Sequence, residues 1–133
     1  MRIFHYTGLE HVDGIQRLGI RHGGLVLPVS GRIIRGVQWL TDDDNWAQPW
    51  ATQHIVHCDR SETRFSVVIP KSARKHLFPW RYLREGLSEK DVAELEMTPG
   101  GEHWWLYFGN IPAGWIRGLE QRPVGILRTV TVS

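Results

Sequence analysis

Three separated segments of the chain carry side chains that suit binding of, and chemistry on, a planar charged substrate. The first is His5-Tyr6-Thr7, and the second holds Trp39 and Trp50, which lie eleven positions apart. Two indole rings can stack on the two faces of one flat group, and such stacking contributes about 0.5 to 1.5 kcal/mol beyond burial. A cationic ring gains a further cation-π attraction. The third segment begins with Glu102, whose carboxylate can stabilise positive charge in a transition state.

Each of these residues also has an ordinary structural interpretation. His5 suits a hydrogen-bonded core histidine, and each Trp taken alone suits core packing, because Trp buries a large area. Glu102 suits a solvated acid at a strand edge. The joint spacing of the two Trp residues, and the place of Glu102 after a Gly-Gly turn, favour the functional interpretation.

Two other polar groups lack the full pattern of a metal or nucleophile site. The run Asp42-Asp43-Asp44 is explained by the positive first turn of a helix, so we predict no metal there. His54, His57 and Cys58 have no second Cys or His pair at zinc spacing. Cys58 beside His57 could act as a nucleophile, but no wider motif supports that role.

The elements that must position the three segments begin with a strand and a helix. Residues 2–6 suit a strand. Leu9 then opens a helix whose apolar residues recur every three positions, and Gly19 ends it. Residues 21–35 contain several Gly and Pro residues, which predicts a long loop with one short strand. Such a loop could cover a ligand.

The rest of the chain also mixes strands and helices, without repeats, which predicts an α+β fold. Trp104 and Trp105 are adjacent, so a strand sends them to opposite faces, and at least one should pack in the core. Neither is assigned to the site. The predicted elements are a strand over 37–41, a helix from Asp42 to Ala51 or Gln53, a strand over 64–69, one or two helical turns over 71–77, a helix after the N-cap Ser88 that ends before Pro99, and strands over 103–108 and 124–132.

The length of 133 residues fits one domain, so we expect residues 1–133 to form a single domain. No apolar stretch approaches the roughly 20 residues of a membrane span, and the start does not resemble a signal peptide, so we expect a cytoplasmic protein without membrane contact. The one cysteine excludes an internal disulfide. The formal net charge of +2 permits nucleic-acid binding without arguing for it. Seven Trp residues far exceed the usual share and need an explanation.

Taken together, the three segments resemble the ADP-ribosyltransferase superfamily, in particular its branch with a His, a Tyr and a Glu on three core strands. The first strand of that family reads His, then an aromatic residue or Gly, then Thr or Ser, as His5-Tyr6-Thr7 does. The second element resembles Gly36 to Thr41 followed by Trp50-Ala51, with Trp in place of Tyr at both positions. Their spacing equals that of the paired aromatics in the poly(ADP-ribose) polymerase branch. Glu102 opens a segment similar to the family's catalytic strand.

The resemblance implies a compact α+β fold of two small packed β-sheets with flanking helices, with NAD as co-substrate and no metal. Glu102 would be the catalytic carboxylate that stabilises the oxocarbenium-like ribose left when nicotinamide departs. His5 would hydrogen-bond a ribose hydroxyl of NAD, and the backbone of Tyr6 would meet the carboxamide. The other implied NAD contacts are Thr7, Trp39, Thr41 and Trp50 in the pocket, and one of Arg21, Arg32 and Arg35 on the diphosphate.

The implied reaction is transfer of one ADP-ribose to a macromolecule, with a protein favoured over a nucleic acid as acceptor. The loops over 21–36 and 71–87 would set the choice of acceptor. Small transferases of this kind are often toxins or proteins of conflict between bacteria and phages. NAD hydrolysis, a nucleic-acid acceptor, and an inactive module that binds a nucleotide or a partner remain open alternatives. An RNA 2′-phosphotransferase shares the fold, but its additional Arg and His motifs are not found in this sequence.

Overall fold

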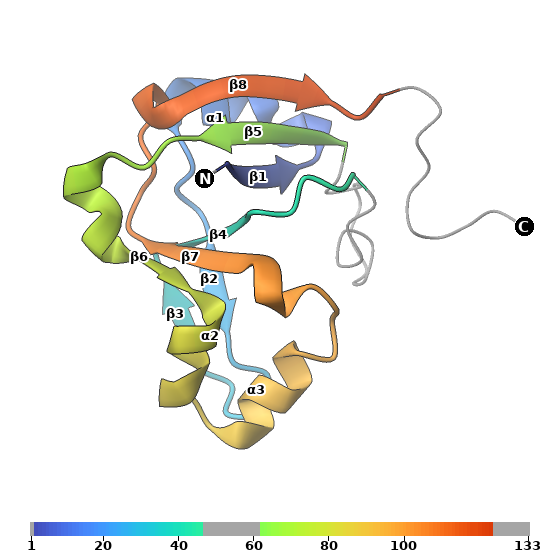
Figure 1. Ribbon diagram of the computed structural model, residues 1–133, viewed down its shortest axis with the longest axis vertical. Coiled ribbons are helices and arrows are strands. Elements are labelled where there is room, and N and C mark those ends of the chain that lie inside the picture. Colours follow the sequence, from blue (N-terminus) through green and yellow to red (C-terminus); the bar gives the residue numbers. More distant parts are fainter. Residues whose placement is uncertain (1, 47–61, 124–133) are drawn as a thin grey trace, which may run out of the picture.

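Strands of three to six residues form the framework of the chain, whose computed structural model describes residues 2–46 and 62–123. Their bounds are β1 Ile3–Thr7, β2 Gly24–Val26, β3 Ile33–Arg35, β4 Val37–Thr41, β5 Thr63–Val67, β6 Leu77–Pro79, β7 Trp104–Phe108 and β8 Ile116–Gln121. Six of them form one antiparallel sheet in the order β6-β7-β4-β1-β5-β8, and β2 pairs with β3 in a separate hairpin (Figure 1).

The helices are short and lie at the ends and faces of the six-stranded sheet (Figure 1). No helix in the described ranges is long and apolar enough to cross a membrane. The α-helices are α1 Val12–Leu18, α2 Trp80–Leu83 and α3 Glu89–Leu95, and the 3₁₀ helices are η1 Leu9–His11, η2 Lys71–His76, η3 Arg84–Gly86, η4 Gly101–His103 and η5 Ala113–Trp115.

Side chains alternate between the two faces of the sheet, and each face has its own core. Ile3, Leu40 and Phe65 point to one face and pack with Ile15 of α1, so we call it the α1 face. Val37 points to the opposite face, which packs against the β2–β3 hairpin and α2, so we call it the hairpin face. Burial of each large apolar side chain contributes about 1.5 to 3 kcal/mol, and the two cores hold the sheet between them.

Several local predictions are confirmed, beginning with the mixed α+β class. Gly19 ends α1 with a φ of 82°, and a Cβ there would lie 2.1 Å from the carbonyl oxygen of Ile111, so only Gly fits. Ser88 caps α3, because its hydroxyl accepts a 3.1 Å hydrogen bond from the N–H of Asp91. Trp104 is buried on the hairpin face, whereas Trp105 packs against the core of the α1 face.

The predicted loop over 21–35 is wrong in one respect, because it holds two strands and not one. β2 and β3 pair Gly24 with Arg35, Leu25 with Ile34 and Val26 with Ile33. The turn closes with a 2.8 Å hydrogen bond from the N–H of Leu27 to the carbonyl of Arg32. Leu25 and Leu27 are both buried against the hairpin face, a tertiary contact that the local run of Gly and Pro concealed.

The predicted helix that starts at Asp42 is also wrong for the described part, residues 42–46, which form a bend instead. The Thr41 hydroxyl accepts from the N–H of Asp43 at 3.1 Å, and an Asp43 carboxylate oxygen accepts from the N–H of Asn45 at 3.0 Å. Such side-chain bonds to nearby backbone compete with helix formation. The remainder of the predicted helix lies outside the described residues.

The last described strand, β8, was not predicted, although it pairs with β5 along the whole of that strand. Its side chains are mostly exposed, so the sequence lacks the apolar alternation that reveals a half-buried strand. The strand predicted over 124–132 lies outside the described residues.

Candidate functional site

The three candidate segments lie on neighbouring strands of the six-stranded sheet. His5 belongs to β1, Trp39 belongs to β4, and Glu102 directly precedes β7. β4 lies between β1 and β7. Since β4 and β7 pair at all five of their residues, the end of β4 and the beginning of β7 meet. Segments separated by more than 30 residues in sequence are thus brought to one region of the sheet.

β1 and β4 share one paired position, and we call the unpaired stretch between the two strands the β1–β4 split. The ladder joins Phe4 to Thr41, whereas β1 pairs with β5 at all five of its residues. The His5 ring lies in this β1–β4 split, with its Nδ1 3.1 Å from the carbonyl oxygen of Trp39. A carbonyl oxygen only accepts, so Nδ1 carries the hydrogen and Nε2 is an acceptor. Nε2 is therefore free to accept from a hydroxyl donor in this tautomer.

The surroundings of His5 favour the neutral form of its ring. Burial lowers its pKa from the ordinary value, its hydrogen bond to the Trp39 carbonyl opposes that effect, and the nearby His11 adds to it. Because the folded pKa lies below the unfolded one, the neutral ring favours folding at pH values above about 6.5. This contribution is lost as the pH falls through the folded pKa.

Trp39 points to the hairpin face, opposite to His5, and is partly buried in a cluster of three indoles. Its ring centroid lies 6.0 Å from that of Trp80 and 5.5 Å from that of Trp104. Its Nε1 donates a 2.9 Å hydrogen bond to the carbonyl of Gly24 on the hairpin. Trp39 therefore holds the hairpin to the sheet. Trp50 lies outside the described residues.

Tyr6, Thr7 and Thr41 are all buried and help to join the strand ends around the split. The Tyr6 hydroxyl donates to the carbonyl of Asp43 at 2.9 Å and accepts from Nη1 of Arg64 at 3.1 Å. Burial raises the pKa of Tyr6, and the Arg64 guanidinium works against that rise. The carbonyl of Thr7 accepts a 2.7 Å hydrogen bond from a β5 hydroxyl.

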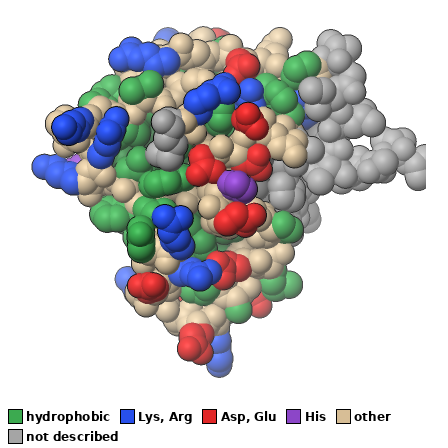
Figure 2. Space-filling view, in the orientation of Figure 1, with side chains coloured by type: hydrophobic (Ala, Val, Ile, Leu, Met, Phe, Trp, Pro, Cys, Tyr) green, Lys and Arg blue, Asp and Glu red, His purple; other side chains and the backbone are tan. Residues whose placement is uncertain are grey.

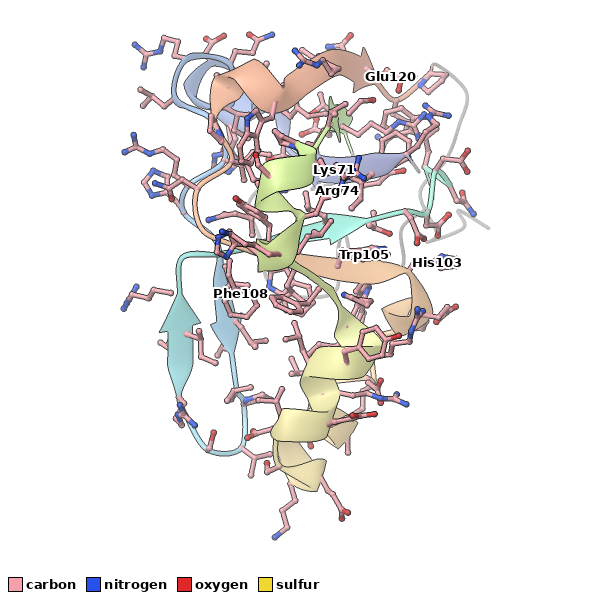
Figure 3. All side chains as sticks on the ribbon, turned by 60° about the vertical axis from the view of Figure 1, so that its left-hand side comes forward. Lys71, Arg74, His103, Trp105, Phe108 and Glu120 are labelled. Atoms are coloured by element: carbon pink, nitrogen blue, oxygen red, sulfur yellow. The ribbon has the colours of Figure 1, made fainter. Side chains whose placement is uncertain are left out.

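Glu102 belongs to a chain of charged groups that sequence reasoning missed. Its Oε1 lies 3.8 Å from Nε2 of His103, whose Nδ1 lies 2.7 Å from Oδ1 of Asp42. The other Asp42 oxygen accepts from Nε1 of Trp105 at 3.0 Å, and His103 and Trp105 lie near one another in Figure 3. The register that pairs Thr41 with Trp104 puts Asp42 beside His103. The sequence does not reveal this register, and without it the local pattern around Asp42 indicated a helix N-terminus.

His103 provides a pH-dependent prediction. Its hydrogen bond to the Asp42 carboxylate raises its pKa, against a smaller effect of burial, and the charges of Asp42, Asp43 and Glu102 raise it further. We expect Asp42→Asn to lower this pKa, as followed by NMR of the imidazole protons. In the unmodified chain, the His103 contribution to stability is present below about pH 6.5 and is lost as the pH rises through the folded pKa.

The exposed acid Asp13 on α1 supplies the control for that titration. Asp13→Asn removes the same charge away from His103 and should leave its pKa within about 0.2 of the original value, given the screening of distant charges. An unchanged His103 pKa in Asp42→Asn would show that the Asp42 contact does not form in solution.

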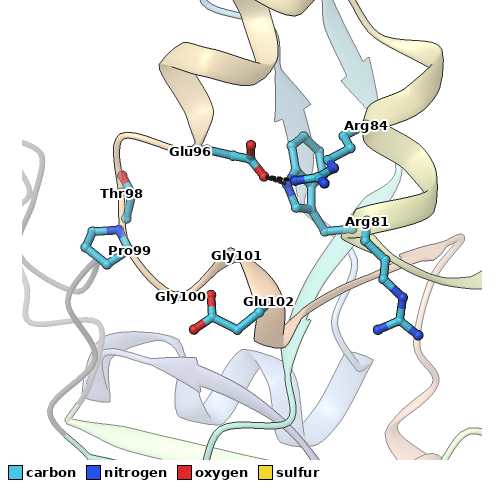
Figure 4. A pocket seen from close by; sticks show the side chains of 9 residues that line it. Arg81, Arg84, Glu96, Thr98, Pro99, Gly100, Gly101 and Glu102 are labelled. Carbon is cyan, nitrogen blue, oxygen red and sulfur yellow. Dashed lines mark hydrogen bonds and ion pairs between the residues drawn. The ribbon is translucent and has the colours of Figure 1, made fainter.

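Glu102 also lies at the rim of a hollow on the hairpin side of the sheet (Figure 4). The hollow has a volume of about 460 Å³, within the range of small-molecule sites. Glu96 accepts from Nε1 of Trp80 at 3.0 Å and from Arg84 at 2.8 Å, and these bonds lower the Glu96 pKa against the effect of burial. The lining residues are Trp80, Arg81, Arg84, Glu96, Thr98, Pro99, Gly100, Gly101 and Glu102.

The three arginines considered for a diphosphate lie around the hairpin. Arg21 follows the bridge residue Ile20, and Arg32 and Arg35 flank or end β3. All three side chains are exposed. Within residues 2–46 and 62–123, no hydrogen bond or ion pair joins them to the three candidate segments. The three arginines are therefore exposed cations on or beside the β2–β3 hairpin.

The fold and the site together define an α+β protein with a six-stranded antiparallel sheet, a His side chain between β1 and β4, and a carboxylate at the beginning of the adjoining strand. In the described portion of the chain, no three His, Cys, Asp or Glu residues are grouped so as to hold a metal ion. Comparison of the chain with models of protein families, with curated proteins and with solved structures finds no match in any of the three.

Proposed function

We propose that this protein is a mono-ADP-ribosyltransferase that uses NAD to modify a macromolecule. The observation that carries the proposal is the arrangement of the three segments on adjacent strands, with a single paired position between the strand of His5 and the strand of Trp39. These are the same three segments in which the sequence resembles the ADP-ribosyltransferases. Their proximity in space is independent of that resemblance.

The residues at the β1–β4 split suit recognition of a nucleoside. Nε2 of His5 can accept from a ribose hydroxyl, because its Nδ1 is fixed on the Trp39 carbonyl. The partly exposed Trp39 ring lies on the hairpin face, where it packs with Trp80. A ligand between β1 and β4 would therefore reach both residues, although their side chains point to opposite faces of the sheet. Exposed arginines on the hairpin supply charges for a diphosphate.

Glu102 would act on the ribose attached to nicotinamide. The bond between the ribose C1 and the pyridinium nitrogen breaks, both electrons go to nitrogen, and neutral nicotinamide leaves. A carboxylate near the ribose hydroxyls stabilises the positive charge that develops on the sugar. An acceptor oxygen or nitrogen then bonds to C1 and loses its proton. His103, held by Asp42 and 3.8 Å from Glu102, would orient the carboxylate as a positioning residue.

The experiment is incubation of the purified chain with NAD labelled on the adenylate phosphate, together with separate protein and nucleic-acid fractions. The proposal predicts stable label on a macromolecule and release of one nicotinamide for each label transferred. Release of nicotinamide with free ADP-ribose as the sole labelled product would indicate NAD hydrolysis. Absence of both products would leave a binding module and refute the enzymatic proposal.

A further inference from the structure

One segment next to the candidate site is strongly basic. The stretch from Thr63 to Arg84 contains six Lys or Arg residues and no Asp or Glu. Four of its cations are exposed on η2 and α2, namely Lys71, Arg74, Lys75 and Arg81, and we call this set the basic strip. Lys71 and Arg74 project from η2 in Figure 3, and Lys and Arg side chains gather over this side of the molecule in Figure 2.

The cations of the basic strip are not neutralised by neighbouring acids. Within the ranges that the structure describes, no carboxylate lies within 4.0 Å of any of the four. The Nε–H of Arg74 donates a 3.3 Å hydrogen bond to the carbonyl of Ile69. This bond holds the side chain in place, and the guanidinium group remains exposed. Arg84, just beyond the strip, is the contrasting case, since it pairs with Glu96 at 2.8 Å. The strip is therefore available to an anionic partner.

Two exposed aromatic rings accompany these cations. Phe78 on β6 is 37% exposed and packs edge-on against Phe108, with ring centroids 5.7 Å apart. Tyr82 on α2 is 61% exposed, and the guanidinium carbon of Arg81 lies 5.1 Å from its ring centroid. Cations alone would attract any polyanion, whereas exposed rings among cations favour a polyanion that carries flat groups.

The basic strip ends at the hollow that holds Glu102. Arg81 and Arg84 line one part of that hollow, and the turn from Gly100 to Glu102 lines another. Figure 4 shows Arg81 and Glu102 bordering the same opening. A strand that follows η2, β6 and α2 would therefore arrive beside the carboxylate.

We infer that the basic strip, with Phe78 and Tyr82, binds single-stranded nucleic acid and delivers it to Glu102 as the acceptor. Phosphates pair with the cations while unpaired bases stack on the two rings. A duplex would hide its base faces, and an acidic protein would leave the rings without flat partners. The assignment of an acceptor rests on the transferase proposed above, but the binding itself does not depend on it.

The test measures binding without NAD, by fluorescence anisotropy of labelled oligonucleotides of about 20 nucleotides, one of DNA and one of RNA. The altered protein carries Lys71→Gln, Lys75→Gln and Arg81→Gln together. A matched control carries Arg17→Gln, Lys90→Gln and Arg117→Gln, which remove the same charge from other exposed positions. The DNA and RNA arms identify which strand the chain prefers.

We expect the strip variant to bind at least tenfold more weakly, and the slope of log affinity against log salt to fall in magnitude by about 2. The control should lose at most about threefold. Tyr82→Ala should weaken binding about fivefold or more while leaving the salt slope unchanged, because stacking carries no charge.

Equal losses in the strip variant and its control would overturn the inference, as would unchanged affinity in Tyr82→Ala. Binding of poly-glutamate as tight as that of either oligonucleotide would point to an acidic protein partner and would also overturn it. If the unmodified chain binds oligonucleotide but transfers no label from NAD to any macromolecule, the transferase is refuted and the strip is not.

Discussion

Glu102→Gln is expected to lower the rate of ADP-ribose transfer by about 10²- to 10³-fold, the usual cost of removing one electrostatic group that stabilises a transition state. The amide keeps the size and hydrogen-bonding reach of the side chain and removes its charge. Because the Glu102 side chain is 74% exposed, the substitution should leave folding intact. The measurement is the initial rate of label transfer at saturating NAD, so the loss should appear in kcat.

Glu89 on α3 provides the matched control, since it is an exposed glutamate outside the candidate site. Glu89→Gln should transfer ADP-ribose at the original rate. His103→Gln, which removes the positioning contact, should lower kcat less than Glu102→Gln and should alter its pH profile. A Glu102→Gln protein that keeps the original kcat would exclude Glu102 as the catalytic carboxylate.

Trp80→Ala is expected to lower the free energy of unfolding by about 3 to 5 kcal/mol, because a large buried side chain is replaced by a cavity. Trp80 is 1% exposed and contacts both other indoles of the cluster, with its ring centroid 5.9 Å from that of Trp104. It also donates to Glu96. Since small domains are stable by roughly 5 to 15 kcal/mol, this loss is a large share of the total. Urea unfolding measures it.

Two further substitutions separate packing from surface effects. Trp80→Phe keeps an aromatic ring but loses the bond to the Glu96 carboxylate, so we expect a smaller loss of about 1 to 3 kcal/mol. Tyr82→Ala, on the same short helix but 61% exposed, should change the free energy of unfolding by less than about 0.5 kcal/mol. Similar losses for Trp80→Ala and Tyr82→Ala would show that the indole cluster is not part of the folded core.

Local patterns in the sequence predict several elements well. β1, β4 and β7 follow from short runs of β-branched and aromatic residues, and the end of α1 follows from Gly19. These signals are local, since each depends on a few neighbouring side chains. The identity of neighbouring strands is not local, because it depends on contacts between residues more than 30 positions apart. The proximity of the three candidate segments therefore needed the structure.

The wrong helix prediction at Asp42 has the same origin. Asp42 suits a helix N-terminus on local grounds, but its carboxylate is bound by His103 and Trp105 from another strand. Trp39, whose stacking on NAD stays a prediction, donates its indole N–H to the carbonyl of Gly24 and packs its ring with Trp80. In both cases a tertiary partner decides the role of the side chain, and no pattern around the residue identifies that partner.

The division of the sheet into two faces affects how NAD binding should be tested. His5 points to the α1 face and Trp39 to the hairpin face, so a ligand that contacts both must lie in the β1–β4 split itself. A ligand in the hollow would contact Trp80 and Arg81 and leave His5 untouched. These two positions are distinguishable by direct observation of bound NAD.

A crystal structure of the protein with NAD is the most direct test of the account. We predict that NAD lies in the β1–β4 split, with a ribose hydroxyl about 3 Å from Nε2 of His5, a hydrogen-bond distance. The nicotinamide ribose should face Glu102. NAD bound at saturating concentration with no contact to His5, or with its nicotinamide ribose turned away from Glu102, would contradict the proposed site and the function built on it.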